Sequence, residues 1–182
     1  MSLLLCDTLC EYELWEVQMY NVGEYAVCPG HGVGQIVDIE ERELGGAISK
    51  FYILKIISNG MTVMVPTNSQ EGIRGLVGEQ EINEVYDLLE DHDVEVDNST
   101  WNRRYREYML KIKTGSLKEI AEVLRALFLL KEKKALSFGE KKMLDQCRDL
   151  ISQEIALAEG QERTEINTRI NSSFESEGPS IN

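Results

Sequence analysis

The sequence has few of the residues that build metal centres and disulfide frameworks. Its 182 residues include four cysteines and two histidines. The cysteines are scattered without a C-x-x-C pair, so their spacing predicts neither a zinc site nor a set of disulfides. We therefore expect a protein without a metal ion or other cofactor, in a reducing, cytoplasmic compartment.

Long apolar runs are also missing. Leu3-Leu4-Leu5 has no positive residues before it, and Asp7, Glu11 and Glu13 interrupt it, so we expect neither an export signal nor a membrane segment. Residues 1–18 show no clear period and are interpreted as an extension. With 42% hydrophobic residues, the rest is long enough for one globular domain or two small ones.

Signatures of catalysis are scarce. The glycine-rich run from Pro29 to Gly34 lacks a following Gly-Lys-Ser/Thr and leads into a strand pattern, so it predicts a turn and not a phosphate loop. His31 has no visible catalytic partners, and Cys28 lies in an apolar pattern typical of a small core residue. We do not expect an enzyme, although a small enzyme using His31 or Cys28 stays an alternative.

Charge is distributed unevenly. The net charge is -13, yet the segment from Thr100 to Arg148 holds 13 Lys/Arg against 6 Asp/Glu, a local charge of +7. Such asymmetry is typical of a chain that presents one positive face to a polyanion. Lysines and arginines on helices often only solvate an outer face, however, and an isolated Trp101 would fit a core position.

Residues 19–73 show a β pattern. Short apolar or alternating runs cover Tyr25–Cys28, residues 33–43, Phe51–Ile57 and Met61–Val65, and Pro66 ends the last. Asn59-Gly60 predicts a type I′ hairpin turn, and Gly45-Gly46 a further turn. Several short strands joined by tight turns indicate a small bent sheet or barrel.

Residues 74–160 show helical periods instead. Helices are expected near 79–89, from Trp101 to Gly115, and after Ser116 and Ser137, each of which begins a capping-box sequence with Glu119 or Glu140. An acidic linker is expected over 91–98. Residues 161–182 have little apolar repeat, so we expect a polar, frayed or disordered tail. The fold class expected is a two-part α+β fold.

Five segments of the sequence carry a joint resemblance to a known family. They are Val22–Gly34, Lys50–Ile56, Asn59–Pro66, Thr100–Met109 and Leu136–Leu144. In order and spacing, from about Val22 to Ala158, they resemble the CarD/CdnL family of bacterial RNA polymerase-binding transcription regulators.

The resemblance implies a Tudor-like or SH3-like β domain that binds the β subunit of RNA polymerase, and a helical domain that contacts promoter DNA at the upstream edge of the bubble. It implies that the chain stabilises the open complex through largely sequence-independent minor-groove contacts. Because the chain is acidic overall, we expect this DNA binding to be weak, and we expect a monomer. The implied DNA-binding residues are Trp101 as the wedge, with Arg103, Arg104 and Arg106 on the backbone; the implied polymerase-binding residues are Arg42, Met64 and Pro66.

A second interpretation stays open at this stage. The basic helices could meet an acidic protein surface, which would make the chain a protein–protein adapter of the transcription machinery without a DNA role. That hypothesis predicts that Trp101→Ala leaves the open-complex lifetime unchanged.

Overall fold

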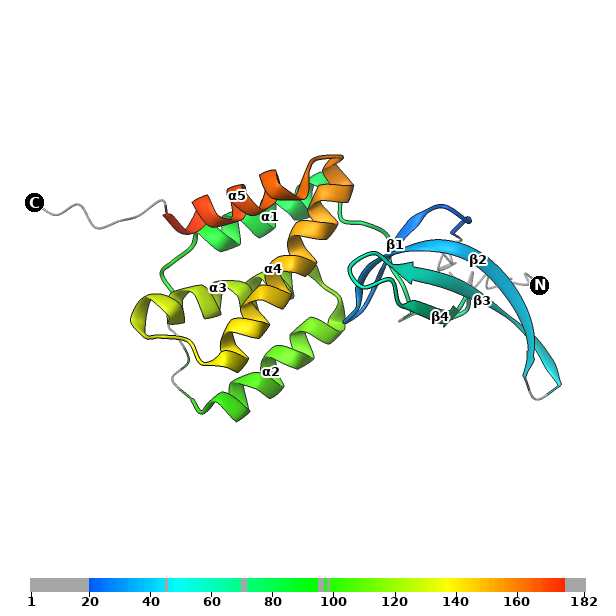
Figure 1. Ribbon diagram of the computed structural model, residues 1–182, viewed down its shortest axis with the longest axis horizontal. Coiled ribbons are helices and arrows are strands. Elements are labelled where there is room, and N and C mark those ends of the chain that lie inside the picture. The colour runs from blue at the N-terminus through cyan, green and yellow to red at the C-terminus, as the bar shows by residue number, and fades with distance from the viewer. Residues whose placement is uncertain (1–19, 45, 70–71, 95–96, 98, 176–182) are drawn as a thin grey trace, which may run out of the picture.

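The computed structural model describes residues 20–44, 46–69, 72–94, 97 and 99–175. The predicted extension 1–18, Gly45 of the predicted turn, part of the acidic linker and residues 176–182 lie outside this part of the chain. The chain forms two parts placed side by side, a curled antiparallel sheet and a bundle of helices (Figure 1). The two-part α+β fold expected from the sequence is confirmed.

The sheet has the strand order β1-β2-β3-β4, with every neighbouring pair antiparallel. The strands are β1 (Tyr25–Cys28), β2 (Gly32–Leu44), β3 (Ala47–Ile56) and β4 (Thr62–Pro66). A register shift between Ile36 and Asp38 marks a bulge in β2, and bulges increase the local bend of a strand. The sheet is a half-barrel whose core includes Ile36, Tyr52, Leu54 and Ile56.

The predicted hairpin at Asn59-Gly60 forms, but not with the predicted type I′ turn. That turn needs positive φ at both central residues, whereas Gly60 has φ 70° and no non-glycine residue in the described part has positive φ. The Ile56 N–H donates to the Met61 carbonyl at 2.8 Å, so a longer loop closes the hairpin. The Asn59 side chain accepts the Met61 N–H within this loop.

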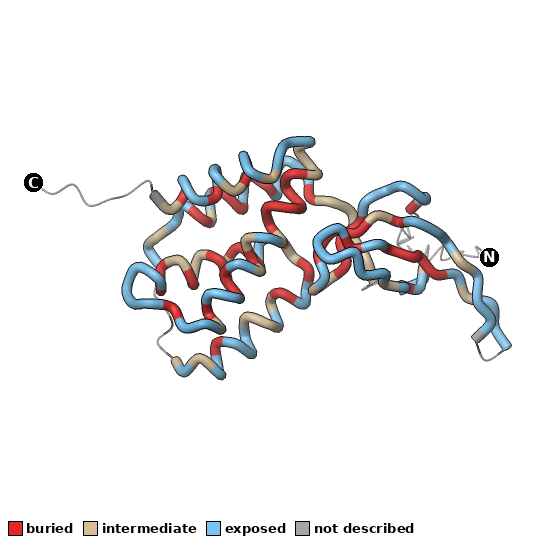
Figure 2. Tube along the Cα trace, in the orientation of Figure 1, coloured by how far each residue is buried: buried red, intermediate tan, exposed pale blue. Residues whose placement is uncertain are grey.

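The described part contains five helices that share one apolar core (Figure 2). They are α1 (Glu79–Glu90), α2 (Trp101–Thr114), α3 (Leu117–Lys133), α4 (Phe138–Glu159) and α5 (Arg163–Glu175). Gly115, in the left-handed conformation with φ 73°, caps α2 as expected. The capping box at Ser137 and Glu140 is confirmed as well.

The prediction of a frayed tail from residue 161 is wrong for residues 163–175. Helix α5 lies along α1 (Figure 1), and its Ile166 and Ile170 are fully buried. Only these two isoleucines and Phe174 join the core, so the apolar period is too sparse to reveal the helix from the sequence. Helix α5 is therefore stabilised by the packing of its narrow apolar stripe against the rest of the bundle.

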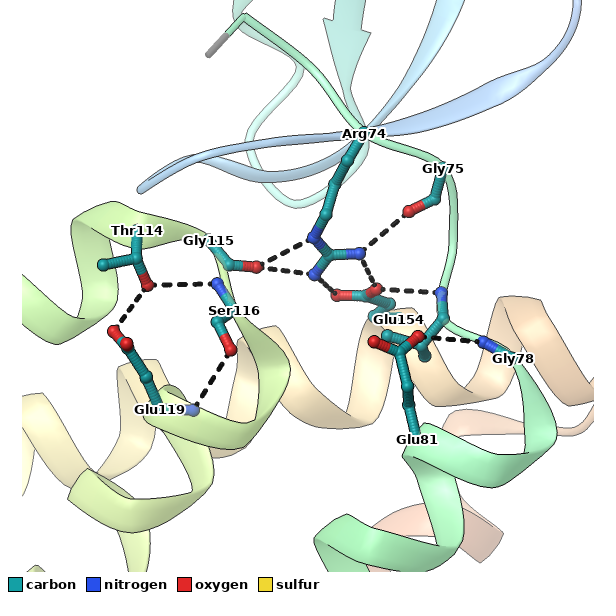
Figure 3. Close-up of polar contacts among 10 residues, drawn as sticks. Arg74, Gly75, Gly78, Glu81, Thr114, Gly115, Ser116, Glu119 and Glu154 are labelled. Atoms are coloured by element: carbon teal, nitrogen blue, oxygen red, sulfur yellow. Dashed lines mark hydrogen bonds and ion pairs between the residues drawn. The ribbon is translucent and has the colours of Figure 1, made fainter. Parts of the chain in front are cut away.

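The predicted capping box at Ser116 and Glu119 is only half made. The Ser116 hydroxyl accepts the Glu119 N–H at 3.5 Å. The Glu119 carboxylate instead accepts the Thr114 hydroxyl at 2.7 Å, and the Ser116 N–H donates to that same hydroxyl (Figure 3). The Glu119 carboxylate therefore bonds to the Thr114 hydroxyl, whereas in a full capping box it would accept the Ser116 N–H.

Candidate nucleic-acid interface

Trp101 is the first residue of α2 and is half-buried against the helical core. Its ring meets Tyr105 edge-on, with centroids 5.5 Å apart. A Cβ added at Gly139 would lie 3.2 Å from the indole Cζ2 and Nε1, so the indole rests on the backbone at the start of α4. Packing on one side therefore holds the indole in place, and exposure on the other side leaves part of the ring accessible.

Arg104 is not where the sequence interpretation put it. Its side chain is only 4% exposed, and Nη2 donates to the Glu140 carboxylate at 2.6 Å. Its guanidinium also lies 5.6 Å from the centroid of the Trp101 ring. The expectation that Arg104 contacts a DNA backbone is corrected, because a buried, ion-paired guanidinium positions the indole and is not available to a phosphate.

Glu140 bonds to the residues that support the indole on both helices. Burial alone would raise the pKa of its carboxyl, but hydrogen bonds from Arg104, from the Ser137 N–H and hydroxyl and from Lys134 lower that pKa to about 2. The Ser137 N–H donates to Oε2 at 2.8 Å, while Arg104 and Lys134 donate to Oε1. The carboxylate thus joins the first turns of α2 and α4, the two elements that hold the indole.

The other two predicted arginines face solvent. The Arg103 side chain is 72% exposed and forms an ion pair with Glu107, one turn later, at 3.2 Å. An ion pair this exposed to water adds little to the stability of the fold. Arg106 is exposed and forms no ion pair with any described residue. On α4, Lys141 and Lys142 are likewise exposed and unpaired within the described ranges. The indole therefore lies between the starts of two helices that carry exposed cations.

The three residues expected to contact polymerase lie on one face of the sheet. Pro66 is opposite Phe51, which is in turn opposite Glu40. Met64 is opposite Ile53, and Arg42 follows Glu40 by two residues. Directly opposed residues, and residues two apart on a strand, point to the same side. Arg42 is exposed and forms a 2.7 Å ion pair with Glu40, while Met64 is 40% exposed.

The outer edges of the sheet differ. On β1, the N–H and carbonyl of Val27 both bond to Arg74, at 2.8 and 3.1 Å, so that edge is partly occupied. Strand β4 pairs with β3 on one side and with no other strand in the described part. An open strand edge of this kind can pair with a strand from another chain.

Arg74 joins the two parts of the molecule (Figure 3). Its guanidinium donates to both carboxylate oxygens of Glu154 on α4, at 2.5 and 3.0 Å, and to the Gly115 carbonyl at 2.6 and 3.0 Å. Its backbone pairs with Val27 on β1. The Glu154 side chain is only 3% exposed and also accepts the Val77 N–H at 3.2 Å. Arg74 thus links the sheet, the C-terminal end of α2 and the C-terminal part of α4.

Helix α2 connects this junction to the indole. Gly115 at its C-terminal end contacts Arg74, and Trp101 begins its far end (Figure 1). Fourteen residues at about 1.5 Å each make a rod of about 21 Å. The helix therefore holds the indole at a set distance from the sheet.

Sequence reasoning missed Arg74, Glu154 and the structural role of Arg104. A signal existed for two of them, because Glu154 lies between Ile151 and Ile155 on the apolar stripe of its helix, and Arg104 shares a face with Tyr108 and Ile112. A charged residue on an apolar stripe indicates a buried partner. Which partner it has cannot be read from spacing.

The residues considered for catalysis are poorly suited to it. Burial raises the pKa of the Cys28 thiol, whereas a nucleophilic cysteine needs a lowered pKa. His31 is exposed in the turn before β2. No group of three potential metal ligands occurs among the described residues, and no described helix has the length and apolarity of a membrane span.

Comparison with known proteins identifies both parts. A family model described as "CarD-like/TRCF RID domain" matches residues 20–77, and one described as "CarD, C-terminal domain" matches residues 84–171. The chain belongs to the CarD/CdnL family of transcription regulators. The C-terminal match extends into α5, which agrees with the packing of that helix in the CarD domain.

Two relatives give the extent of the likeness. The "Putative transcription factor YdeB" of Bacillus subtilis is 33% identical over 144 residues, which is 78% of this chain and 94% of that protein. A solved structure described as "CdnLNt from Myxoccoccus xanthus" is 39% identical, covers 34% of this chain and 90% of its own, and has a TM-score of 0.30.

Proposed function

We propose that this CarD-family regulator binds the β subunit of RNA polymerase through its sheet and contacts promoter DNA through the starts of α2 and α4. The observation that carries the proposal is the half-exposed Trp101 indole, which packs on Gly139 and Arg104 and lies at the starts of two helices that carry exposed cations. A flat apolar ring among cations suits a kinked or unpaired base step next to phosphates.

The mechanism is differential binding. An indole that contacts melted or distorted DNA better than intact duplex lowers the free energy of the open state relative to the closed state. Base–aromatic stacking is worth about 1–3 kcal/mol, which corresponds to about a 5- to 150-fold change in an equilibrium constant.

Docking on polymerase is what makes the weak DNA contact effective. The chain carries a net charge of -13, so the free protein is expected to bind DNA weakly and with strong salt dependence. Attachment of the sheet to polymerase raises the local concentration of the indole at the bubble, and the rigid α2 limits where the indole can reach. The open edge of β4 could supply backbone hydrogen bonds to polymerase, while Arg42 and Met64 on the neighbouring face supply specificity.

The test is the lifetime of open complexes formed by purified polymerase. We expect Trp101→Ala to shorten the lifetime without weakening polymerase binding, and Arg42→Glu to weaken polymerase binding and thereby remove the effect. Arg106→Ala should weaken DNA contact uniformly across promoters and lower its salt dependence. An unchanged lifetime with Trp101→Ala, together with lost activity for Arg42→Glu, would favour the adapter without a DNA role.

A further inference from the structure

The helical bundle has a cavity away from the residues proposed to contact DNA and polymerase. Its volume is about 500 Å³, within the range of about 300–1,000 Å³ typical of small-molecule sites. Arg148 lies ten residues after the start of α4, which is about 15 Å along the helix from the end that packs on Trp101. The C-terminal ends of α3 and α5, which complete the cavity, lie at the end of the bundle remote from the sheet (Figure 1). The residues that line this α3–α5 cavity are Phe128, Lys131, Glu132, Arg148, Asn171 and Phe174.

One wall of the cavity is a stack of aromatic rings. The rings of Phe128 and Phe174 are parallel within 6°, with centroids 3.9 Å apart, and the His92 ring stacks on Phe174 at 5.9 Å. Lys131 Nζ lies over the Phe128 ring, 5.4 Å from its centroid. Lys131 is exposed and forms no ion pair with any described residue, so only a weak cation–π contact holds its ammonium there. A flat ligand ring can therefore displace the ammonium and extend the stack.

The polar groups of the cavity have unused hydrogen-bonding capacity. Arg148 donates through Nη2 to Asp145 at 3.0 Å, whereas its buried Nε–H has no partner. The Asp145 side chain is 66% exposed, so this ion pair is weak, and a phosphate bound side-on to Nε and Nη2 can replace it. The side chains of Glu132 and Asn171 are exposed and bond to no other described residue. The cavity thus offers donors to an anion and acceptors to N–H groups.

This combination of groups selects the class of ligand. Inorganic phosphate would use Lys131 and Arg148 but would leave the aromatic wall in water. An apolar ligand would cover the wall but leave the charged groups without partners. A nucleotide satisfies both, because its base is a flat ring for Phe128, its N–H groups donate to Glu132 or Asn171, and its phosphates bind the two cations.

We propose that the α3–α5 cavity binds a free nucleoside phosphate, with the base on Phe128 and the phosphates on Lys131 and Arg148. The ligand is a reversibly bound effector and not a resident cofactor. This inference does not depend on the proposed contact to promoter DNA. Because the ligand would touch three helices of the folded bundle, its binding would stabilise the packing of α5.

Amide chemical shifts of the ¹⁵N-labelled full chain locate the binding site. With ATP or GTP as the probe, we expect saturable shifts centred on residues 128–132, 146–149 and 170–174. Tripolyphosphate and adenosine each lack one half of the ligand, so each should bind at least about 5-fold more weakly. Shifts centred on the basic start of α2, or equal affinity for tripolyphosphate, would overturn the proposal. Binding of a short single-stranded DNA but not of ATP or GTP would assign the cavity to a nucleic-acid strand and would also overturn it.

Variants test the residues in the same titration. We expect Lys131→Ala to weaken ATP binding about 3- to 5-fold and Phe128→Leu about 5- to 10-fold. Lys133→Ala is the matched control, because Lys133 is exposed on the same helix but lies two residues further along, on another side. Equal effects of Lys131→Ala and Lys133→Ala would contradict a specific site, and this comparison holds even if Phe128→Leu does not fold. Absent nucleotide binding with normal open-complex lifetimes overturns the cavity proposal and leaves the proposed function standing.

Discussion

The link between the two parts of the molecule predicts a large effect for Arg74→Met. The substitution keeps a long apolar stem but removes the guanidinium that pairs with Glu154 and the Gly115 carbonyl. The Glu154 carboxylate, 3% exposed, would keep only the Val77 N–H as a partner. Breaking a buried ion pair by removing one partner costs about 3–5 kcal/mol.

The lower end of that range is expected here. The Arg74 side chain is 32% exposed, so water can enter the vacated space and solvate part of the carboxylate. We therefore expect Arg74→Met to lower the free energy of unfolding by about 3 kcal/mol. Glu154→Gln keeps one acceptor oxygen for Arg74 and should cost less, about 1–2 kcal/mol.

Urea unfolding followed by far-ultraviolet circular dichroism measures these losses. Because the pair bridges two parts, Arg74→Met should also separate the single transition into two, with a smaller slope for each. Arg163→Met is the matched control, since Arg163 pairs with Asp149 on the surface, where both side chains are more than 40% exposed. In a double-mutant cycle, Arg74→Met and Glu154→Gln together should cost less than the sum of the two single changes.

The same variant tests the role of the junction in function. Arg74→Met leaves the indole and Arg42 in place, so polymerase affinity should be retained while the open-complex lifetime falls. Loss of the Gly115 contact would free one end of α2 and lower the local concentration of the indole at the bubble. A cost for Arg74→Met no greater than that of Arg163→Met, with a normal open-complex lifetime, would refute this reasoning.

Three further predictions follow from single contacts. Glu140→Gln should lower the free energy of unfolding by about 3 kcal/mol at pH 7. The folded-state pKa of Glu140 is depressed to about 2, so the stabilisation that the ionised carboxylate provides is present above the ordinary value of 4.5 and is lost as pH falls from 4.5 towards 2. The free energies of unfolding of wild type and variant, measured by chemical unfolding, should therefore converge in that window. Asp145→Asn, in a more exposed pair, should show little pH-dependent difference from wild type. Gly139→Ala should fail to deliver the roughly 1 kcal/mol that alanine adds to a helix, and should shorten the open-complex lifetime, because its methyl would meet the indole at 3.2 Å; a gain of stability with a normal lifetime would show that the indole does not rest there. Ile170→Ala should cost about 2–5 kcal/mol in urea unfolding, whereas exposed Asn171→Ala should cost under about 0.5 kcal/mol; equal costs would mean that α5 contributes nothing to the core.

The burial of Arg104 changes how the basic cluster is understood. Three arginines within four residues suggest a common target, but the helix turns each to a different environment. Arg104 faces Glu140 inside the bundle, Arg103 pairs with Glu107, and Arg106 remains open. Local charge density cannot separate these residues, because the helical phase places one of them in the core and leaves the other two at the surface.

Much of the architecture was determined by the sequence itself. The order of four strands and the first four helices followed from period-2 and period-3.6 patterns, and the Ser137–Glu140 capping box and the glycine cap at Gly115 from signals a few residues long. Such features depend on neighbours within one or two turns of the chain, so their physics is present in a short window of sequence.

Tertiary structure alone decided which partners the buried charged groups have and what holds the two parts together. Arg74 meets Glu154 across 80 residues, and Arg104 meets Glu140 across 36. Helix α5 is stable because Ile166 and Ile170 find the core, not because its own pattern is strong. Each of these depends on the free energy of burying a group against a distant partner, and that partner is defined only once the chain has folded.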